Sequence, residues 1–177
     1  TFTRATTKYA ANSAGVLLPF AAGAPAITDA GLSVEAAATN LLTYSDDYAN
    51  AAWIKLTDGT GITPAVETDA VPGPFAGTAD RVTFDLASGT GFNDYSLLYR
   101  DVNTGAGQFS RAVWLRSTTP STILFADGLG GYKACTVTAA WTRFDLTSTL
   151  GSSGNFQIGL RGTFGSSDSA TVEIWNS

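Results

Sequence analysis

The sequence of 177 residues contains no histidine and no methionine, and its single cysteine is Cys135. The absence of histidine excludes a histidine-based acid–base relay. Together with the lone cysteine, it also excludes a zinc site built from the usual nitrogen and sulfur ligands. One cysteine cannot form a disulfide within the chain. A chain without methionine, even at its start, is expected to be an excised domain or a processed product.

Charged residues that favour helices are nearly missing, since only three glutamates and three lysines occur. Charged residues make up 14% of the chain and hydrophobic residues 44%. Threonine, aspartate and glycine stand where a helical protein carries glutamate and lysine. Long helices and coiled coils need a more highly charged surface than this. The composition is typical of an all-β protein.

The formal net charge is −5 and no basic run occurs, so neither nucleic acid nor an anionic lipid surface is an expected partner. No stretch approaches the roughly 18 apolar residues of a membrane span. No phosphate loop or nucleotide motif is present, so no organic cofactor is expected. A structural calcium ion bound by Asp46, Asp47, Asp58 and Asp80 is one alternative that the sequence leaves open. Ordinary turn propensity explains the twelve aspartates equally well.

Residues 1–39 are mostly small and have no periodic apolar face, and Pro19 and Pro25 interrupt any regular pattern. Such a segment cannot bury enough apolar surface by itself. We therefore predict an extended N-terminal arm that is either disordered or laid against a partner surface.

After about Asn40 the pattern changes to short runs in which apolar and polar residues alternate, as in the strands of a sandwich. Eight runs are predicted as strands: 81–86, 96–102, 108–117, 122–126, 132–138, 141–146, 156–161 and 171–175. The link 127–131 contains residues that tolerate positive φ, so its flanking runs are expected to form a hairpin. We predict an antiparallel β-sandwich of jelly-roll type over residues 40–177.

Residues 39–53, TNLLTYSDDYANAAW, carry a more specific pattern that ends in Trp53. Further motifs follow in order: Thr-Ala-Asp-Arg at 78–81, Trp-Leu-Arg at 114–116, Trp-Thr-Arg at 141–143 and Val-Glu-Ile-Trp at 172–175. Together they resemble the jelly-roll domain of bacteriophage head spike and fiber proteins and of gene transfer agent head spikes. The sequence departs from that pattern at its end, where Asn-Ser replaces the usual glycine and acidic tail.

This resemblance implies a carbohydrate-binding-like jelly roll on the virion surface, assembled in the bacterial cytoplasm and acting outside the cell. Its implied role is to attach the particle to host surface or capsular polysaccharide without catalysing a reaction. Other virion proteins and further copies of the chain, as a homo-oligomer or spike assembly, are the implied partners. The alternative is a purely structural decoration or assembly protein that binds no glycan.

An enzyme is not expected from the distribution of carboxyl groups. Glycoside hydrolysis ordinarily needs a pair of carboxyl groups at a set separation. Glu35, Glu67 and Glu173 are instead scattered through the arm, a loop and the last predicted strand.

Trp114 and Arg116 share the polar face of the run 108–117, opposite to Val113 and Leu115, by the two-residue period of a strand. One interpretation is a tryptophan packed under a loop or the arm, with the arginine lying across it. The other is a flat platform for a sugar ring with a hydrogen-bond donor beside it. The packed interpretation is favoured because outer faces of sandwiches are often covered.

Trp141 and Arg143 share one face of their run, and Tyr99 lies on one face of the run 96–102. If these two strands are neighbours, an aromatic and charged face results, which Arg161 can join. The alternative is a solvated face with cross-strand ion pairs, each of which contributes little.

Two glycine-containing loops, 88–95 and 127–132, supply the remaining candidates. Each combines glycine for shape, an aromatic ring for stacking and asparagine or aspartate for sugar hydroxyls, although ordinary solvated turns have the same composition. Trp53 and Trp175 are expected to be structural. The predicted carbohydrate-binding residues are Trp114, Arg116, Tyr99, Tyr95, Asn93, Asp94, Asp127, Tyr132, Trp141 and Arg143.

Overall fold

The computed structural model describes residues 8–32, 41–75, 77–102, 105–164 and 166–175. The chain divides into two compact units, residues 1–40 and residues 41–177. Parts of the predicted arm, and Glu35 with them, lie outside the described residues. Among the described residues, no helix has the length and apolar character needed to cross a membrane.

The described part of the first unit forms two short antiparallel hairpins, which the sequence pattern did not predict. They pair β1 (Lys8–Ala11) with β2 (Leu17–Phe20), and β3 (Ile27–Thr28) with β4 (Gly31–Leu32). Polar contacts tie them together, since the backbone N–H of Ser13 donates to Asp29 Oδ1 at 2.8 Å. Of the hydrophobic residues in this unit whose burial the structure describes, only Ala10 and Ala26 are buried. Strands held by turns and polar contacts leave no apolar period in the sequence.

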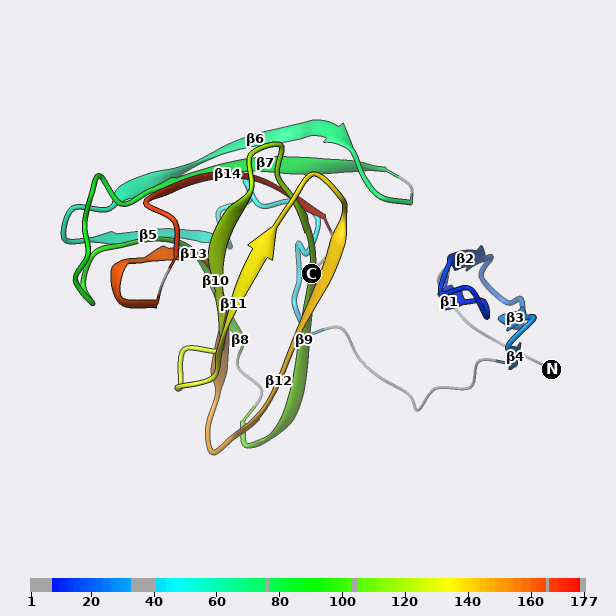
Figure 1. Cartoon of the computed structure of the whole chain (residues 1–177). Helices are drawn as coiled ribbons and strands as arrows, with labels where there is room; N and C mark the ends of the chain where they lie inside the picture. Colours follow the sequence, from blue (N-terminus) through cyan, green and yellow to red (C-terminus); the bar gives the residue numbers. More distant parts are fainter. Residues whose placement is uncertain (1–7, 33–40, 76, 103–104, 165, 176–177) are drawn as a thin grey trace. The chain divides into compact units, whose positions relative to one another are not determined.

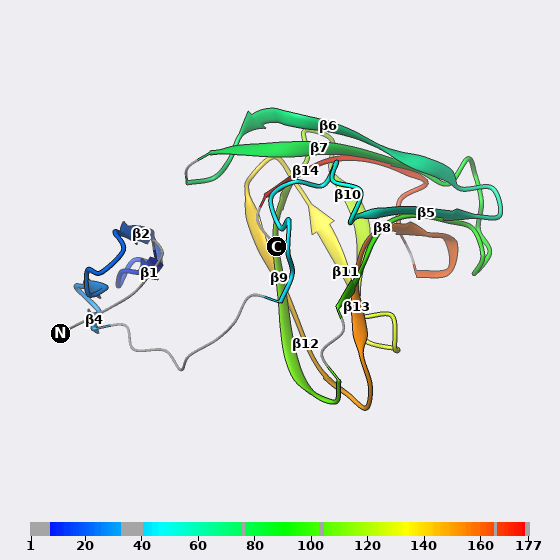
Figure 2. The same cartoon turned by 180° about the vertical axis from the view of Figure 1, so that it is seen from behind.

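The second unit is a sandwich of two five-stranded antiparallel sheets (Figures 1 and 2). We call them the β13 sheet, in the order β11-β10-β13-β8-β5, and the β14 sheet, in the order β12-β9-β14-β7-β6. The strands are β5 (Ile54–Asp58), β6 (Ile62–Pro72), β7 (Thr78–Asp85), β8 (Tyr95–Val102), β9 (Gly107–Arg116), β10 (Ser121–Ala126), β11 (Tyr132–Val137), β12 (Thr142–Leu150), β13 (Gly154–Arg161) and β14 (Ser169–Trp175). A short 3-10 turn, η1 (Gly162–Phe164), follows β13.

The strand pairs show that the sandwich is a jelly roll. β7 pairs with β14, β8 with β13, β9 with β12 and β10 with β11. These are the pairs of one long hairpin whose two legs run from β7 to β10 and from β11 to β14. Successive pairs lie in opposite sheets, so the hairpin is rolled around the core. The predicted fold class is confirmed.

The eight predicted runs coincide with β7 to β14, and the turn at 127–131 joins β10 to β11 as expected. Gly128 and Gly130 occupy the positive φ that this turn requires. The sequence analysis missed β5 and β6. β6 contains Pro64 and Pro72, which argue against a strand, but it lies at the edge of its sheet, where proline is tolerated.

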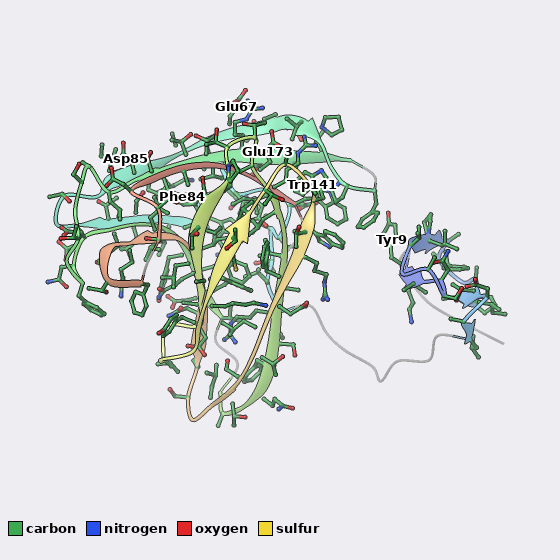
Figure 3. The ribbon with its side chains drawn as sticks, in the orientation of Figure 1. Tyr9, Glu67, Phe84, Asp85, Trp141 and Glu173 are labelled. Carbon is green, nitrogen blue, oxygen red and sulfur yellow. The ribbon has the colours of Figure 1, made fainter. Side chains whose placement is uncertain are left out.

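The core fills the space between the two sheets. The predicted apolar face of Val82, Phe84 and Leu86 is buried there. Figure 3 shows Phe84 between the sheets and Glu67 projecting from the outer side. Cys135 lies in the same core, and burial raises the pKa of its thiol to about 12, so it stays protonated at neutral pH.

Trp53 is fully buried in this core. Its indole N–H donates to the carbonyl of Tyr44 at 2.8 Å, and its ring centroid lies 4.9 Å from that of Tyr48 and 5.5 Å from that of Phe156. These contacts attach the segment before β5 to the core. The expectation that Trp53 is structural is confirmed.

Trp53→Ala is expected to lower the free energy of unfolding by about 3–5 kcal/mol, because it leaves a large cavity in the core. Urea denaturation measures this change. Leu129→Ala, at an exposed loop position, is the matched control and is expected to stay within about 0.5 kcal/mol of the unmodified protein. A similar small change for Trp53→Ala would contradict the structural role.

Candidate functional site

The predicted site residues lie on two different sheets. Trp114 and Arg143 are in register on β9 and β12 of the β14 sheet. Tyr99 and Tyr95 lie on β8 of the β13 sheet. The hypothesis that the strands of Tyr99 and Trp141 are neighbours was wrong, because the rolled hairpin sends β8 and β12 to opposite sheets. Arg161 is in register with Tyr95 and does not join the tryptophans.

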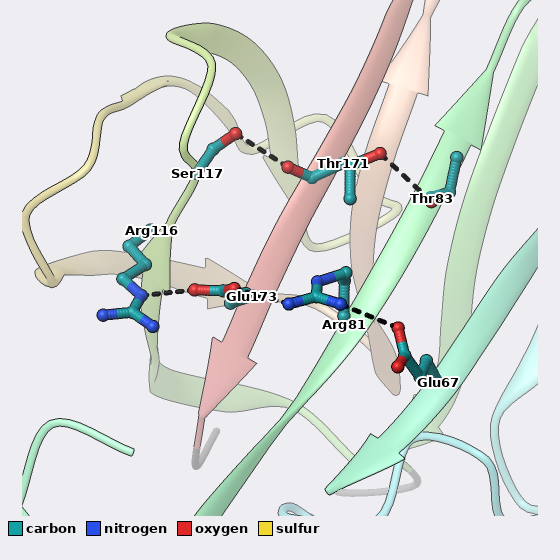
Figure 4. Close-up of polar contacts among 7 residues, drawn as sticks. All are labelled: Glu67, Arg81, Thr83, Arg116, Ser117, Thr171 and Glu173. Atoms are coloured by element: carbon teal, nitrogen blue, oxygen red, sulfur yellow. Dashed lines mark hydrogen bonds and ion pairs between the residues drawn. The ribbon is translucent and has the colours of Figure 1, made fainter. Parts of the chain in front are cut away.

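A row of four charged side chains crosses the outer face of the β14 sheet (Figure 4). Arg81 donates to Glu67 Oε2 at 2.9 Å and to Glu173 Oε1 at 3.2 Å. Arg116 donates through Nε to the other carboxylate oxygen of Glu173. Glu173 is buried, and two arginines compensate its charge. Arg116 is therefore committed to an internal ion pair.

The tryptophans of this face are packed. The ring of Trp114 lies edge-on to Phe75, with 4.9 Å between ring centroids, and Phe75 also contacts Trp175 at 5.6 Å. The guanidinium of Arg116 lies 4.9 Å from the centre of the Trp141 ring. This geometry corresponds to the packed interpretation of Trp114, except that the arginine covers Trp141.

The outer face of the β13 sheet carries a small apolar cluster of Leu97, Leu124 and Ala126. Tyr132, Ala126, Gln157 and Tyr99 are in register across β11, β10, β13 and β8. In the next outward-facing row, Gly159 occupies the middle position. Ala126 and Gln157 therefore lie between two tyrosines, and Gly159 lies between two leucines. One end of this face holds a groove of about 300 Å³.

Three aromatic rings, which we call the aromatic wall, line the groove: Tyr132, Phe164 and Phe92. The centroids of Tyr132 and Phe164 lie 4.5 Å apart, and those of Phe164 and Phe92 lie 6.2 Å apart. Tyr132 is 55% exposed and Phe92 is 57% exposed. Exposed rings beside a groove offer flat apolar surfaces of the kind on which sugar rings stack.

Two polar side chains, Gln157 and Arg161, also line the groove. The Arg161 guanidinium carbon lies 4.6 Å from the ring centre of Phe92 and 4.6 Å from that of Tyr95. A second hollow of about 440 Å³ lies further along β13, beside Tyr99, Asp101 and Asn155. The Tyr99 hydroxyl is hydrogen-bonded to the Asp101 carboxylate.

The aspartates predicted as site residues in the two loops accept hydrogen bonds from backbone N–H groups and so stabilise the loop conformations. Asp127 is buried and accepts hydrogen bonds from the backbone N–H of Leu129 at 2.8 Å and of Gly131 at 2.9 Å. Asp94 accepts from the backbone N–H of Thr60 at 3.0 Å and of Gly91 at 2.6 Å. Their carboxylates are therefore occupied inside the protein. Asn93 is exposed in the same loop as Asp94.

Within the described part of the chain, no three or more aspartate, glutamate or cysteine side chains are grouped closely enough to bind a metal ion. Asp80, one of the calcium candidates, is buried and accepts hydrogen bonds from the backbone N–H of Tyr48 at 2.9 Å and of Asp69 at 3.0 Å. Burial raises the pKa of Asp80. Asp47 accepts from Asn50 and Asp58 from Gly59, so these carboxylates also serve local turns.

The structure adds Phe92, Phe164, Gln157 and Arg161 to the residues of the groove. Phe92 lies inside a loop that the sequence analysis singled out, and the partner strand of Arg161, which the sequence left open, is β8. Phe164 follows a strand end with no pattern of its own, and only the turn η1 brings it beside Tyr132. The two-residue period of a strand already placed Gln157 and Arg161 on the same face. The residues beside them on adjacent strands could not be read from the sequence.

No protein-family model matches this sequence, and the search of curated proteins finds no match. Among solved structures, the chain is similar to the family 11 carbohydrate-binding module of the cellulosomal cellulase Lic26A-Cel5E of Clostridium thermocellum. The identity is 8%, the match covers 74% of this chain and 88% of that one, and the TM-score is 0.47. The K1 cleaved adhesin domain of Lys-gingipain from Porphyromonas gingivalis W83 matches at 12% identity, 75% and 95% coverage, and a TM-score of 0.42. Both likenesses concern the backbone.

Asp94→Asn is expected to destabilise the protein at pH 7. The hydrogen bonds from Thr60 and Gly91 lower the pKa of Asp94 below its ordinary value of 3.8. A lowered native pKa stabilises the fold above the unfolded-state value, and this stabilisation is lost as the pH falls through the native value. Thermal unfolding between pH 7 and pH 3 should show the difference between the two proteins shrinking toward acid pH. An equal difference at both ends would show that the carboxylate charge does not hold the loop.

Proposed function

We propose that this protein is an adhesin that holds a bacterial surface or capsular polysaccharide non-covalently in the groove of the β13 sheet. The observation that carries this proposal is the aromatic wall beside Gln157, in a groove of about 300 Å³. Large aromatic side chains that stay exposed beside a hollow are typical of ligand-binding sites. The rings supply stacking surface, and the amide of Gln157 supplies both a donor and an acceptor for sugar hydroxyls.

The site supports binding without catalysis. Glu67 and Glu173 both contact Arg81, and Arg116 also binds Glu173. These two carboxylates lie on the β14 sheet, and no carboxyl group is among the described residues that line the groove of the β13 sheet. Glycoside hydrolysis ordinarily needs a pair of carboxyl groups at the site. We therefore propose no enzymatic role.

The particle on which the adhesin acts is proposed from the sequence. Residues 39–53 and the motifs that follow resemble the jelly-roll domain of phage head spikes, fibers and gene transfer agent spikes. On this basis we place the protein on a virion surface, assembled in the bacterial cytoplasm among other virion proteins and as a spike oligomer. Its task there is to attach the particle to its host.

A purely structural virion role is the second candidate. The observation in its favour is the cluster of Phe75, Trp114 and Trp175 on the outer face of the β14 sheet, where all three rings are partly exposed. Such a cluster offers contact area to a neighbouring protein.

Two substitutions on opposite sheets separate these candidates. Tyr132→Ala is expected to weaken polysaccharide binding about two- to tenfold, because it removes one stacking ring. Trp114→Ala is the matched control and is expected to bind as the unmodified protein does. A polysaccharide array followed by titration measures both. Loss of binding with Trp114→Ala alone would place the site on the β14 sheet, and binding by neither protein nor variant would favour the structural role.

Binding by the isolated domain is expected to be weak. Each hydrogen bond to a sugar hydroxyl largely replaces one made with water, so a single groove gains little from it. An artificial tetramer should bind a surface coated with the same polysaccharide more tightly by roughly 10²–10⁴, through effective concentration. Calorimetry on the monomer and biolayer interferometry on the tetramer measure the two affinities. Nanomolar affinity of the monomer for a short oligosaccharide would refute this account.

A further inference from the structure

Among the described arginines, Arg161 is the one whose guanidinium has no hydrogen-bond or ion-pair partner in the described part of the chain. Arg81, Arg116 and Arg143 each form an ion pair with a carboxylate. The other two described arginines, Arg100 and Arg111, donate to backbone carbonyls and hydroxyl groups. The Arg161 Nε atom is buried and makes no hydrogen bond to any described residue.

The surroundings of Arg161 stabilise its charge only in part. The guanidinium lies against the rings of Phe92 and Tyr95, each 4.6 Å away. Cation–π contacts of this kind attract the cation and fix the plane of the group. They provide no acceptor for its five N–H donors. Burial lowers the pKa of Arg161, as expected for a cation that has lost water without gaining a carboxylate.

Leaving a partly buried charged donor without an acceptor is unfavourable. The aromatic contacts nevertheless hold Arg161 in one orientation at the lining of the groove. A planar guanidinium held in this way is matched to a planar carboxylate, which it can bind through two parallel hydrogen bonds. The protein itself has a net charge of −5, so a general attraction for polyanions does not account for such a site.

We infer that the groove takes an acidic polysaccharide, and that Arg161 binds the carboxylate of a uronic-acid residue whose ring contacts the aromatic wall. This inference rests on the proposed function and names its substrate class. Gln157 lies four residues away on β13, about 13 Å along the strand, on the same face. Arg161 and Gln157 therefore contact different parts of one polysaccharide chain.

The opposite sheet provides a matched control. Arg143 carries the same charge and is half exposed, but it forms an ion pair of 2.7 Å with Asp145. Its charge is already compensated, and it lies on the β14 sheet, away from the groove. Arg143→Gln changes the net charge of the protein as Arg161→Gln does, so a general effect of charge appears in both variants.

The first experiment uses the full chain and three uronate polymers: polygalacturonate, alginate and hyaluronan. Each is compared with its carboxyl-reduced, neutral derivative, and polyphosphate tests for binding of any polyanion. The unmodified protein is expected to bind at least one acidic polymer, more weakly as salt rises, and to bind its reduced derivative at least tenfold less tightly. Arg161→Gln should lose roughly tenfold to hundredfold in affinity, and Arg143→Gln should keep it.

The outcomes separate the inference from the proposed function. Equal binding of acidic and reduced polymers, an unchanged affinity of Arg161→Gln, or equally tight binding of polyphosphate overturns the uronate inference. If Tyr132→Ala still weakens binding in that case, the groove remains a glycan site. Binding of none of the six polysaccharides overturns the uronate inference, and the polysaccharide array then decides the proposed function separately.

A second measurement avoids any dependence on the folding of the variant. The Nε–H resonance of Arg161 in the unmodified protein is assigned by its absence from Arg161→Lys. It is expected to shift on addition of the uronic acid monomer of the bound polymer, and to stay in place with the corresponding neutral sugar. A resonance that responds to neither sugar would contradict the inference.

Discussion

The rolling of one long hairpin into two sheets determines which outward side chains of this protein meet. In every strand, alternate residues point into the core, so only the other residues of that strand face outward, where a ligand can reach them. The roll then separates neighbouring stretches of sequence, since β8 and β9 face outward on opposite sides of the sandwich. Residues far apart in the sequence come together instead, as Tyr95 and Arg161 do across β8 and β13.

The two outer faces differ in whether their arginines form ion pairs with carboxylates. On the β14 sheet, Arg116, Glu173, Arg81 and Glu67 compensate one another in a continuous row. On the β13 sheet, Arg161 lies against two aromatic rings and forms no ion pair with any carboxylate that the structure describes. The charges on the β14 sheet are compensated by one another and need no ligand. The Arg161 cation, which is held by aromatic rings, is the feature from which we propose that a ligand binds this face.

The sequence predicted the fold class and all eight strands of the roll, because alternation is a local signal that each strand carries within itself. It predicted the site less well. Tyr132 and Tyr95 were named as candidates because they belong to the two glycine-containing loops. The face that they share with Arg161 depends on strand order, which alternation does not encode. Phe164 could not be identified at all, since only the path of the turn η1 brings it to the groove. The strand β6 was missed for a related reason, because Pro64 is tolerated only through its place at a sheet edge.

The turn between β10 and β11 has a consequence for how such a protein can diversify. Its shape is fixed from beneath, by hydrogen bonds from the backbone N–H groups of Leu129 and Gly131 to the buried carboxylate of Asp127. The side chain of Leu129 takes no part in these bonds and is exposed. Evolution is therefore free to replace it without altering the backbone at the rim of the groove. Outward side chains at this rim can therefore vary in sequence while the backbone that carries them keeps its shape.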